Sequence, residues 1–102
     1  MHVEPAIYEY VSTLIENVRN APEVVLGTSV RAGLALVRAA RAWAISYGRN
    51  YVVPDDVKTL AVPVLAHRMV LDPEEDFRGT TTEDVVRKVL ERVSVPLEPA
   101  AR

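Results

Sequence analysis

The sequence predicts an all-α fold, a small four-helix bundle in a single domain of 102 residues, with room for one short two-stranded β pairing. Three observations lead to this prediction. Apolar residues recur at helical spacing in four segments, prolines and glycines fall between those segments, and no cysteine is present to stabilise a loop-rich scaffold instead. With 49% apolar and 25% charged residues, the composition is that of an ordinary globular domain.

The first helix is expected from about Ala6 to Arg19. It follows Pro5, and proline is tolerated in a helix only near its start. Five apolar residues of this segment fall on one stripe: Ile7, Val11, Leu14, Ile15 and Val18. Pro22 then ends the helix, because it biases the residue before it away from helical backbone angles.

The second helix is expected from Val30 to about Tyr47. Ser29 is a good N-cap for it, and Gly48 stands where a C′ glycine is favoured. The segment is apolar almost all round, so we expect it to be the central helix of the bundle. Its tryptophan, Trp43, is therefore expected to be buried in the core.

Two short β-branched segments flank the second helix, Val24–Leu26 and Tyr51–Val53. Both are too short and too β-branched for a helix. If they pair with each other, the pairing is parallel, with the second helix as the crossover between them.

The third helix is expected to begin at Pro54, a good first helical residue, followed by two aspartates that favour the first turn. Pro63 lies within its apolar stripe and is expected to kink or split the helix near residues 59–62. His67 and Arg68 suit its end, where cations oppose the negative end of the helix dipole.

The fourth helix is expected from about Glu83 to Arg92, after a polar loop at Asp72–Gly79. Residues 80–83 form a capping box for it, or Thr82 is itself the cap. Residues 93–102 contain two prolines and are expected to form a tail.

Charge is distributed unevenly along the chain, although its formal sum is only −2. Residues 24–54 carry four arginines and no acid, so this segment is either a solvated helix face or an anion site. A net negative chain lacks the strongly basic footprint of a general nucleic-acid binder. No uncharged run approaches the ~20 residues of a membrane span, and no secretory leader is recognisable. We expect a cytoplasmic protein with no nucleic-acid or membrane partner.

Catalytic motifs are missing from the chain. It contains no Gly-x-x-x-x-Gly-Lys-Ser/Thr phosphate loop and no Gly-x-Ser-x-Gly elbow. Its two histidines, His2 and His67, are too far apart in sequence for a helix-spaced metal pair. The acidic residues within 72–76 lack the glycine and the distal glutamate of a calcium loop, so they indicate a solvated loop. No metal site is expected, and the chain alone is not expected to be an enzyme.

The start of the second helix is the exception. With Ser29 as its cap, Arg31 falls at the second helical position, beside free N–H groups and the positive end of the dipole, where a cation is disfavoured. The position becomes favourable if a phosphate approaches, since anions bind at helix N-termini and arginine grips phosphate with a planar fork. Arg38 and Arg41 lie on the same stripe of the helix, and we expect them to pair with acids of neighbouring helices.

Two stretches of the chain resemble the lid of MoxR-type AAA+ ATPases. The first runs from Val24 to Ala44 and contains the motif Gly-Thr-Ser-Val-Arg that ends at Arg31. The second runs from Gly48 to Arg68 and contains Pro-Asp-Asp-Val at its helix start. Several motifs occur in the family's order and spacing, so the resemblance is specific; it covers about residues 8–71.

In that family the nucleotide lies between an α/β core with the Walker motifs and this helical lid. The arginine of the Gly-x-Ser-x-Arg motif is the sensor-2 residue, which reaches the γ-phosphate. The resemblance therefore implies that Arg31 is catalytic and that Arg31, Ser29 and Val30 belong to the nucleotide-binding site. Val30 replaces the family's usual proline, a change expected to affect the helix start more than the chemistry.

The resemblance also implies a larger parent protein. That protein would be an ATPase whose absent core binds most of the ATP and Mg²⁺, and the lid would associate with that core. A hexameric ring with chaperone-like work on a client protein is implied as well.

A second hypothesis assigns the chain to a different functional class, that of small helical interaction modules. A long central helix and the proline-initiated third helix also resemble histone-fold pairs or small DNA- or protein-interaction modules with no role in nucleotide binding. The net charge of −2 and the apolar central helix argue against it. A salt-dependent affinity for DNA would distinguish the two readings.

Overall fold

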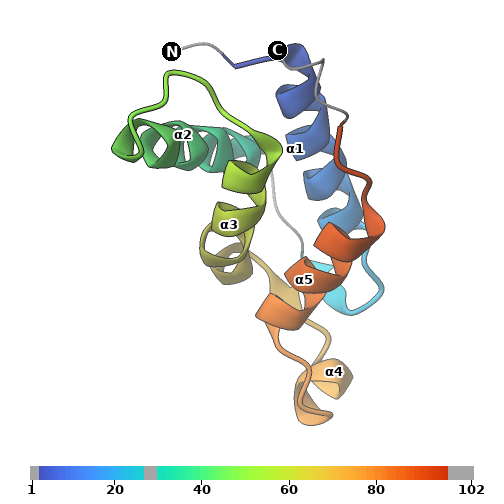
Figure 1. The fold of residues 1–102 in the computed structure, drawn as a ribbon. Coiled ribbons are helices and arrows are strands. Elements are labelled where there is room, and N and C mark those ends of the chain that lie inside the picture. Colours follow the sequence, from blue (N-terminus) through green and yellow to red (C-terminus); the bar gives the residue numbers. More distant parts are fainter. Residues whose placement is uncertain (1–2, 27–29, 97–102) are drawn as a thin grey trace.

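The computed structural model describes residues 3–26 and 30–96, and in these ranges the chain forms a helical bundle (Figure 1). The helices are α1 (Pro5–Arg19), α2 (Val30–Ser46), α3 (Pro54–Leu65), α4 (Pro73–Phe77) and α5 (Thr82–Arg92), with a 3-10 turn η1 (Ala66–Arg68) after α3. Two short strands, β1 (Val24–Leu26) and β2 (Val70–Leu71), pair antiparallel. The predicted all-α fold with one small β pairing is confirmed.

The core lies where α1, α2, α3 and α5 meet. Helix α2 packs against α3 and α1, and α5 closes the bundle against α1 and α3. All five residues of the predicted α1 stripe are buried, as expected. The largest fully buried side chains come from all four helices: Leu14, Val18, Leu36, Val57, Leu65, Val85, Val86 and Val89.

The end of α2 is a Schellman motif built on Gly48. This glycine has a φ of +77°, a conformation that side chains with a Cβ rarely adopt. Its N–H donates to the carbonyl of Ile45 at 2.8 Å, and the N–H of Arg49 donates to the carbonyl of Ala44 at 3.0 Å. The predicted C′ role of Gly48 is confirmed.

The predicted polar loop at residues 72–79 contains a fifth helix, the short α4, so the expected count of four was too low. The Asp72 carboxylate caps it by accepting from the Glu74 N–H at 2.9 Å, and Pro73 occupies the first position. An acid followed by proline is a start signal for a helix even where no apolar stripe follows.

The cap of α5 is Thr81, one residue away from either predicted box position. Its hydroxyl accepts from the Asp84 N–H at 3.1 Å, while the Asp84 carboxylate accepts from the Thr81 N–H at 3.0 Å. An aspartate completes the box in place of the glutamate that the sequence suggested.

Pro63 does not split α3, so of the two predicted effects, a kink or a split, the split was wrong. The helix continues through it to Leu65 and tightens into η1. Proline in a helix removes the hydrogen bond to the carbonyl four residues before it. Here that carbonyl belongs to Thr59, and both Thr59 and Pro63 lie on the exposed side of the helix, where water can replace the missing donor.

The expected parallel pairing of Val24–Leu26 with Tyr51–Val53 is also wrong, because β1 pairs with β2 instead. Helix α2 has 17 residues and is therefore about 25 Å long. The residues after it lead directly into α3, which starts at Pro54. Strand β2, which follows α3 and η1 back along the bundle, reaches β1.

Helix α2 is not covered all round, and Trp43 is only partly buried. The Trp43 ring lies at the end of α2, edge-on to Tyr47 with 5.3 Å between ring centroids. Leu34 and Ile45, on the outer face, are 51% and 59% exposed. The predicted burial of Trp43 fails because small side chains form much of the covered face, allowing close helix approach: Ala32, Ala40 and Ala44.

Candidate functional site

The first turn of α2 presents Arg31 to solvent. The helix begins at Val30, so Arg31 occupies the predicted second position, and the first turn contains no acid. The Arg31 side chain is exposed and has no ion pair or hydrogen bond with any residue that the structure describes. Val30 is 76% exposed. Ser29, the third predicted site residue, lies outside the described residues.

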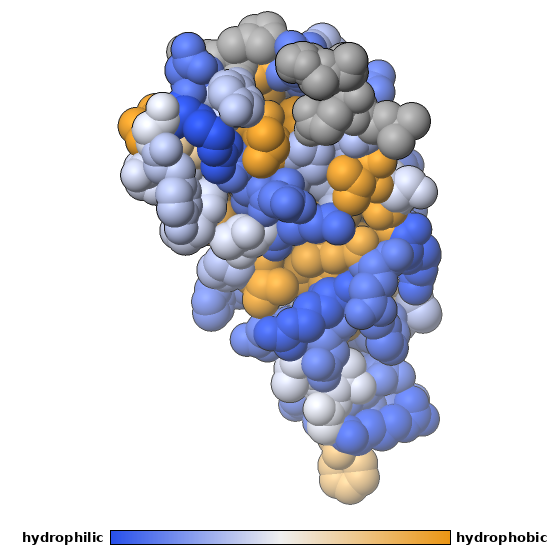
Figure 2. All heavy atoms as spheres, viewed as in Figure 1, coloured by the Kyte–Doolittle hydropathy of each residue, from blue (hydrophilic) through white to orange (hydrophobic). Residues whose placement is uncertain are grey.

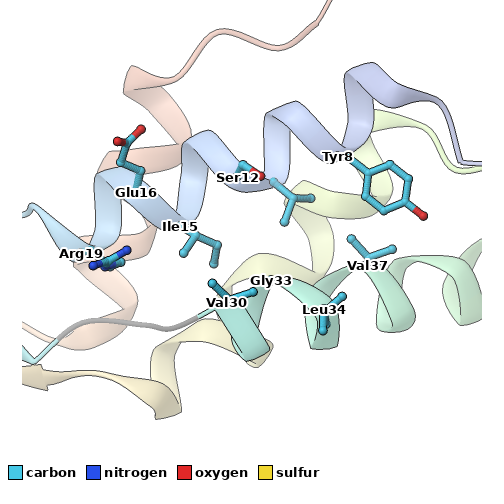
Figure 3. Close-up of a pocket in the computed structure, with 10 residues that line it drawn as sticks. Tyr8, Ser12, Ile15, Glu16, Arg19, Val30, Gly33, Leu34 and Val37 are labelled. Atoms are coloured by element: carbon cyan, nitrogen blue, oxygen red, sulfur yellow. The ribbon is translucent and has the colours of Figure 1, made fainter.

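A groove of about 390 Å³ runs between α1 and α2 beside this helix start. Figure 3 shows Ile15 on α1 facing Val30 on α2 across the groove, with Arg19 at the same end and Tyr8 at the opposite end. Its walls are largely apolar, and it is lined by Tyr8, Val11, Ser12, Ile15, Glu16, Arg19, Val30, Gly33, Leu34 and Val37. Sequence reasoning placed Arg31 but missed this groove, because the facing residues come from two helices.

This arrangement is suited to an anion. The free N–H groups at the start of a helix and the positive end of its dipole favour negative charge. Arg31 adds a guanidinium with no partner in the described part of the chain to that end of α2, and Arg19 adds a second cation at the nearby end of the groove. Glu16, the one acid in the lining, is on α1, and in Figure 3 its carboxylate points away from α2.

The predicted ion pairs of Arg38 and Arg41 are not present. Neither guanidinium has an acid within 4.0 Å among residues 3–26 and 30–96. Two acids of neighbouring elements are paired with other cations, Glu23 with Lys88 at 3.1 Å and Asp56 with Arg49 at 2.7 Å. The two arginines remain on the outer face of α2.

A buried ion pair at the other end of α2 was not predicted. Arg49 donates two hydrogen bonds to the Asp56 carboxylate, at 2.8 and 2.7 Å, and one to the Tyr51 carbonyl at 3.2 Å. Asp56 also accepts from the Val53 N–H at 2.8 Å and is only 2% exposed. The pair ties the turn after α2 to the first turn of α3.

The environment of Asp56 stabilises its ionised form. Burial by itself would raise the pKa of this carboxyl, but the hydrogen bonds from Arg49 and Val53, with the positive charge of Arg49, together lower the pKa below its ordinary value. The hydrogen bonds to Asp56, with the negative charge of that carboxylate, raise the pKa of Arg49. An acid three residues into a proline-initiated helix, with an arginine in the preceding turn, was the sequence signal for this pair.

No Mg²⁺ ligand is assigned to this chain. The described part of the chain contains no group of three or more His, Asp or Glu side chains that could hold a metal ion. Within the same ranges, every helix is too short or too polar to cross a membrane.

The chain matches the family model of the AAA lid domain over residues 16–89. It is 40% identical over 101 residues to the uncharacterized protein YeaC of Bacillus subtilis, a match that covers 99% of this chain and 32% of YeaC. It is also 40% identical over 73 residues to the chaperone MoxR1 of Mycobacterium tuberculosis, which covers 72% of this chain and 19% of MoxR1. The chain therefore spans about a third or less of the length of these relatives.

The fold also matches the crystal structure of a protein from Cytophaga hutchinsonii that is assigned as an ATPase. The TM-score is 0.87 at 28% sequence identity, and the match covers 93% of this chain and 32% of that protein. The family model covers well over half of the chain, and the relatives with known names are MoxR proteins, so the sequence resemblance is confirmed. This chain belongs to the AAA lid domain family, in its MoxR-type branch.

Proposed function

We propose that this chain acts as a lid that closes over ATP bound to an α/β core, and that Arg31 contacts the γ-phosphate as the sensor-2 residue. The observation that supports this proposal best is the exposed guanidinium of Arg31, which has no partner among residues 3–26 and 30–96 and lies on a helix start that contains no acid. A cation there is unfavourable in the isolated lid, and a phosphate would make it favourable.

Arg31 would help to neutralise charge on the transferred phosphoryl group. Catalysis of phosphoryl transfer consists mostly of positioning and electrostatic stabilisation, so one well-placed arginine has a large effect on the rate. Val30, at the same helix start, and Ser29 would lie beside the phosphates. The chemistry of hydrolysis itself, including Mg²⁺, would be supplied at the core.

The lid can contribute only a small part of the free energy of ATP binding. One charged hydrogen-bonded contact contributes about 1.5–3 kcal/mol, which corresponds to a factor of about 10 to 150 in affinity. Micromolar nucleotide binding needs about 8 kcal/mol. The chain alone should therefore bind ATP at millimolar strength or not measurably, and the core must supply the rest. Assembly of such ATPases into a hexameric ring that acts on a client protein is part of the same proposal.

The test is a chimera in which this chain replaces the matching third of the Bacillus subtilis relative. At saturating ATP, Arg31→Ala should lower turnover by about 10- to 100-fold, because it removes charge stabilisation in the transition state. Arg87→Ala, which removes an exposed arginine of α5, is the matched control and should leave turnover unchanged. Circular dichroism should show the same helical content for both variants. Equal turnover of the Arg31→Ala and unmodified chimeras would remove the sensor-2 assignment.

A further inference from the structure

The outer face of α2 carries a stripe of two exposed aliphatic residues and two arginines, of which one is exposed and one partly exposed in the described structure. It consists of Leu34, Arg38, Arg41 and Ile45, which we call the α2 stripe. Their spacing places all four within about 60° of one another around the helix. More than half of the surface of each apolar member is exposed, and the two arginines between them have no acidic partner in the described ranges. Charge and apolar surface are thus combined on one unpartnered helix face.

The opposite end of the molecule carries the complementary chemistry. Phe77, the last residue of α4, is 94% exposed. Glu74 and Asp76 lie beside it on α4, and their carboxylates have no partner among the described residues, whereas Glu75 is held by Arg78 and Thr80 at 2.9 and 3.0 Å. We call Glu74, Asp76 and Phe77 the α4 tip. Figure 2 shows this end of the molecule as mostly hydrophilic, with a hydrophobic group at its extremity.

The two surfaces cannot meet within one molecule. Helices α2 and α4 lie at opposite ends of the bundle (Figure 1), and the molecule measures 46 Å along its longest axis. A nearly fully exposed phenylalanine beside two acids, and two arginines between exposed aliphatic residues, match in charge and in apolar character; none of these four charges has a partner in the described ranges. Both surfaces are present on every copy of the chain.

We propose that the α4 tip of one copy docks on the α2 stripe of a second copy. Phe77 would pack against the aliphatic members of the stripe, and the two free carboxylates of the tip would face its two arginines. This contact goes beyond the proposed ATP function and does not use Arg31. Its failure would therefore leave the sensor-2 proposal standing, and the reverse also holds.

The contact is heterologous, because each copy uses two different surfaces. Every docked copy leaves one tip and one stripe free, so the contact continues into a ring or an open chain of copies. The area involved is small, and isolated copies should therefore associate weakly, with a Kd on the order of 0.1–1 mM. Copies that are already joined through other domains would dock more firmly, because the second contact is then intramolecular.

The primary experiment is sedimentation equilibrium of the chain over a range of concentrations. At about 0.01 M salt, where the Debye length is about 30 Å, the average mass should rise with concentration; at about 1 M salt, where it is about 3 Å, the rise should be lost or strongly reduced. Phe77→Ser should weaken association at least tenfold. A chain that stays monomeric at millimolar concentration in low salt would overturn the proposal.

Charge reversal identifies the surfaces. A stripe variant (Arg38→Glu with Arg41→Glu) and a tip variant (Glu74→Arg with Asp76→Arg) should each be monomeric alone, and a mixture of the two should associate again because both contacts are restored. A control variant, Arg87→Glu with Arg92→Glu on the exposed face of α5, has the same net charge as the stripe variant and should associate like the unmodified chain. Association of either reversed variant alone, or none in the mixture, would count against the contact.

A photo-crosslinker in place of Phe77 maps the contact without altering its charges. Cross-links should join it to residues 34–45 of a second copy. Cross-links confined to other parts of the second copy would overturn the proposal, as would binding of the stripe to DNA or to anionic vesicles in preference to a second copy of the chain.

Discussion

Arg31 and Arg49 lie at opposite ends of α2 and have opposite environments. Arg31 is the second residue of α2. Its side chain is exposed and has no partner in the described ranges. Arg49 follows the helix end and gives two short hydrogen bonds to a carboxylate that is 2% exposed. The guanidinium of Arg31 is therefore available to bind a ligand, whereas the guanidinium of Arg49 is already bound to Asp56 within the fold. In this lid the satisfied charge of Arg49 lies at the structural end of α2, and the charge of Arg31 lies at the end that we propose to be functional.

The largest expected effect on folding comes from removing the buried acid. Asp56→Ala should lower the free energy of unfolding by about 2–3 kcal/mol, because it leaves the Val53 N–H without its acceptor and breaks the pair with Arg49. For a domain of this size that corresponds to roughly 10–20 °C in melting temperature. Thermal melts followed by circular dichroism measure it.

The contrast requires that the other end of the helix be tolerant. Arg31→Ala, at the start of α2, should change the free energy of unfolding by less than about 1 kcal/mol. Asp55→Ala, which removes the exposed acid next to Asp56, should also change it by less than about 1 kcal/mol. If Arg31→Ala destabilised the lid as much as Asp56→Ala, the distinction between a structural and a functional end would be lost.

The pH dependence of stability should come in part from Asp56. Its pKa is lower in the folded chain than in the unfolded chain, so its contribution is fully present above the unfolded value of about 3.9 and is lost as the pH falls through the folded value. Stability should therefore decline with acid below about pH 4, and urea titrations across this range should detect the slope. Asp56→Asn should flatten it.

Two other carboxyls also have lowered pKa values, so part of the decline of stability with acid should remain in Asp56→Asn. The pKa of Asp84 is lowered mainly by its backbone hydrogen bond with Thr81, and the pKa of Glu23 by a backbone hydrogen bond and by Lys88. Asp84→Asn, as a control on an exposed cap, should flatten the acid slope less than Asp56→Asn. An unchanged slope in Asp56→Asn would show that the buried pair does not govern acid stability.

The smallest expected effect concerns Gly33, midway along the groove. A Cβ there would lie 3.6 Å from side-chain atoms of Ile15 and Val11, an ordinary van der Waals contact. Gly33→Ala should therefore raise the free energy of unfolding by about 0.5–1 kcal/mol, because alanine is the better helix former. A melting temperature below that of the unmodified chain would mean that the groove between α1 and α2 cannot accept even one methyl group.

Local signals predicted most of the fold. Features that depend on neighbours within a few residues could be predicted. They are the α1 stripe, the proline starts of α1 and α3, and the glycine at the end of α2. The predictions of the fold that were wrong have a different cause. The pairing of β1 with β2 and the incomplete burial of Trp43 both depend on how whole helices are placed.

The candidate site divides in the same way. Arg31 could be singled out because a cation at a helix start contradicts the dipole, a local argument. The groove beside it needs two helices, and the free state of Arg38 and Arg41 depends on which acids their neighbours have already engaged. The bond between Arg49 and Asp56 spans seven residues across a turn, and no periodicity reports such a contact.

The α2–α3 hairpin is clamped at both of its ends. At the turn between the helices, Arg49 and Asp56 hold the chain; at the open end, β1 pairs with β2, and the Asp72 N–H donates to the Glu23 carbonyl at 2.8 Å. Bending between α2 and α3 would therefore have to break the Arg49–Asp56 pair or the β1–β2 pairing. The start of α2 and the short helix α4 are therefore connected through a hairpin whose two ends are both held by such contacts.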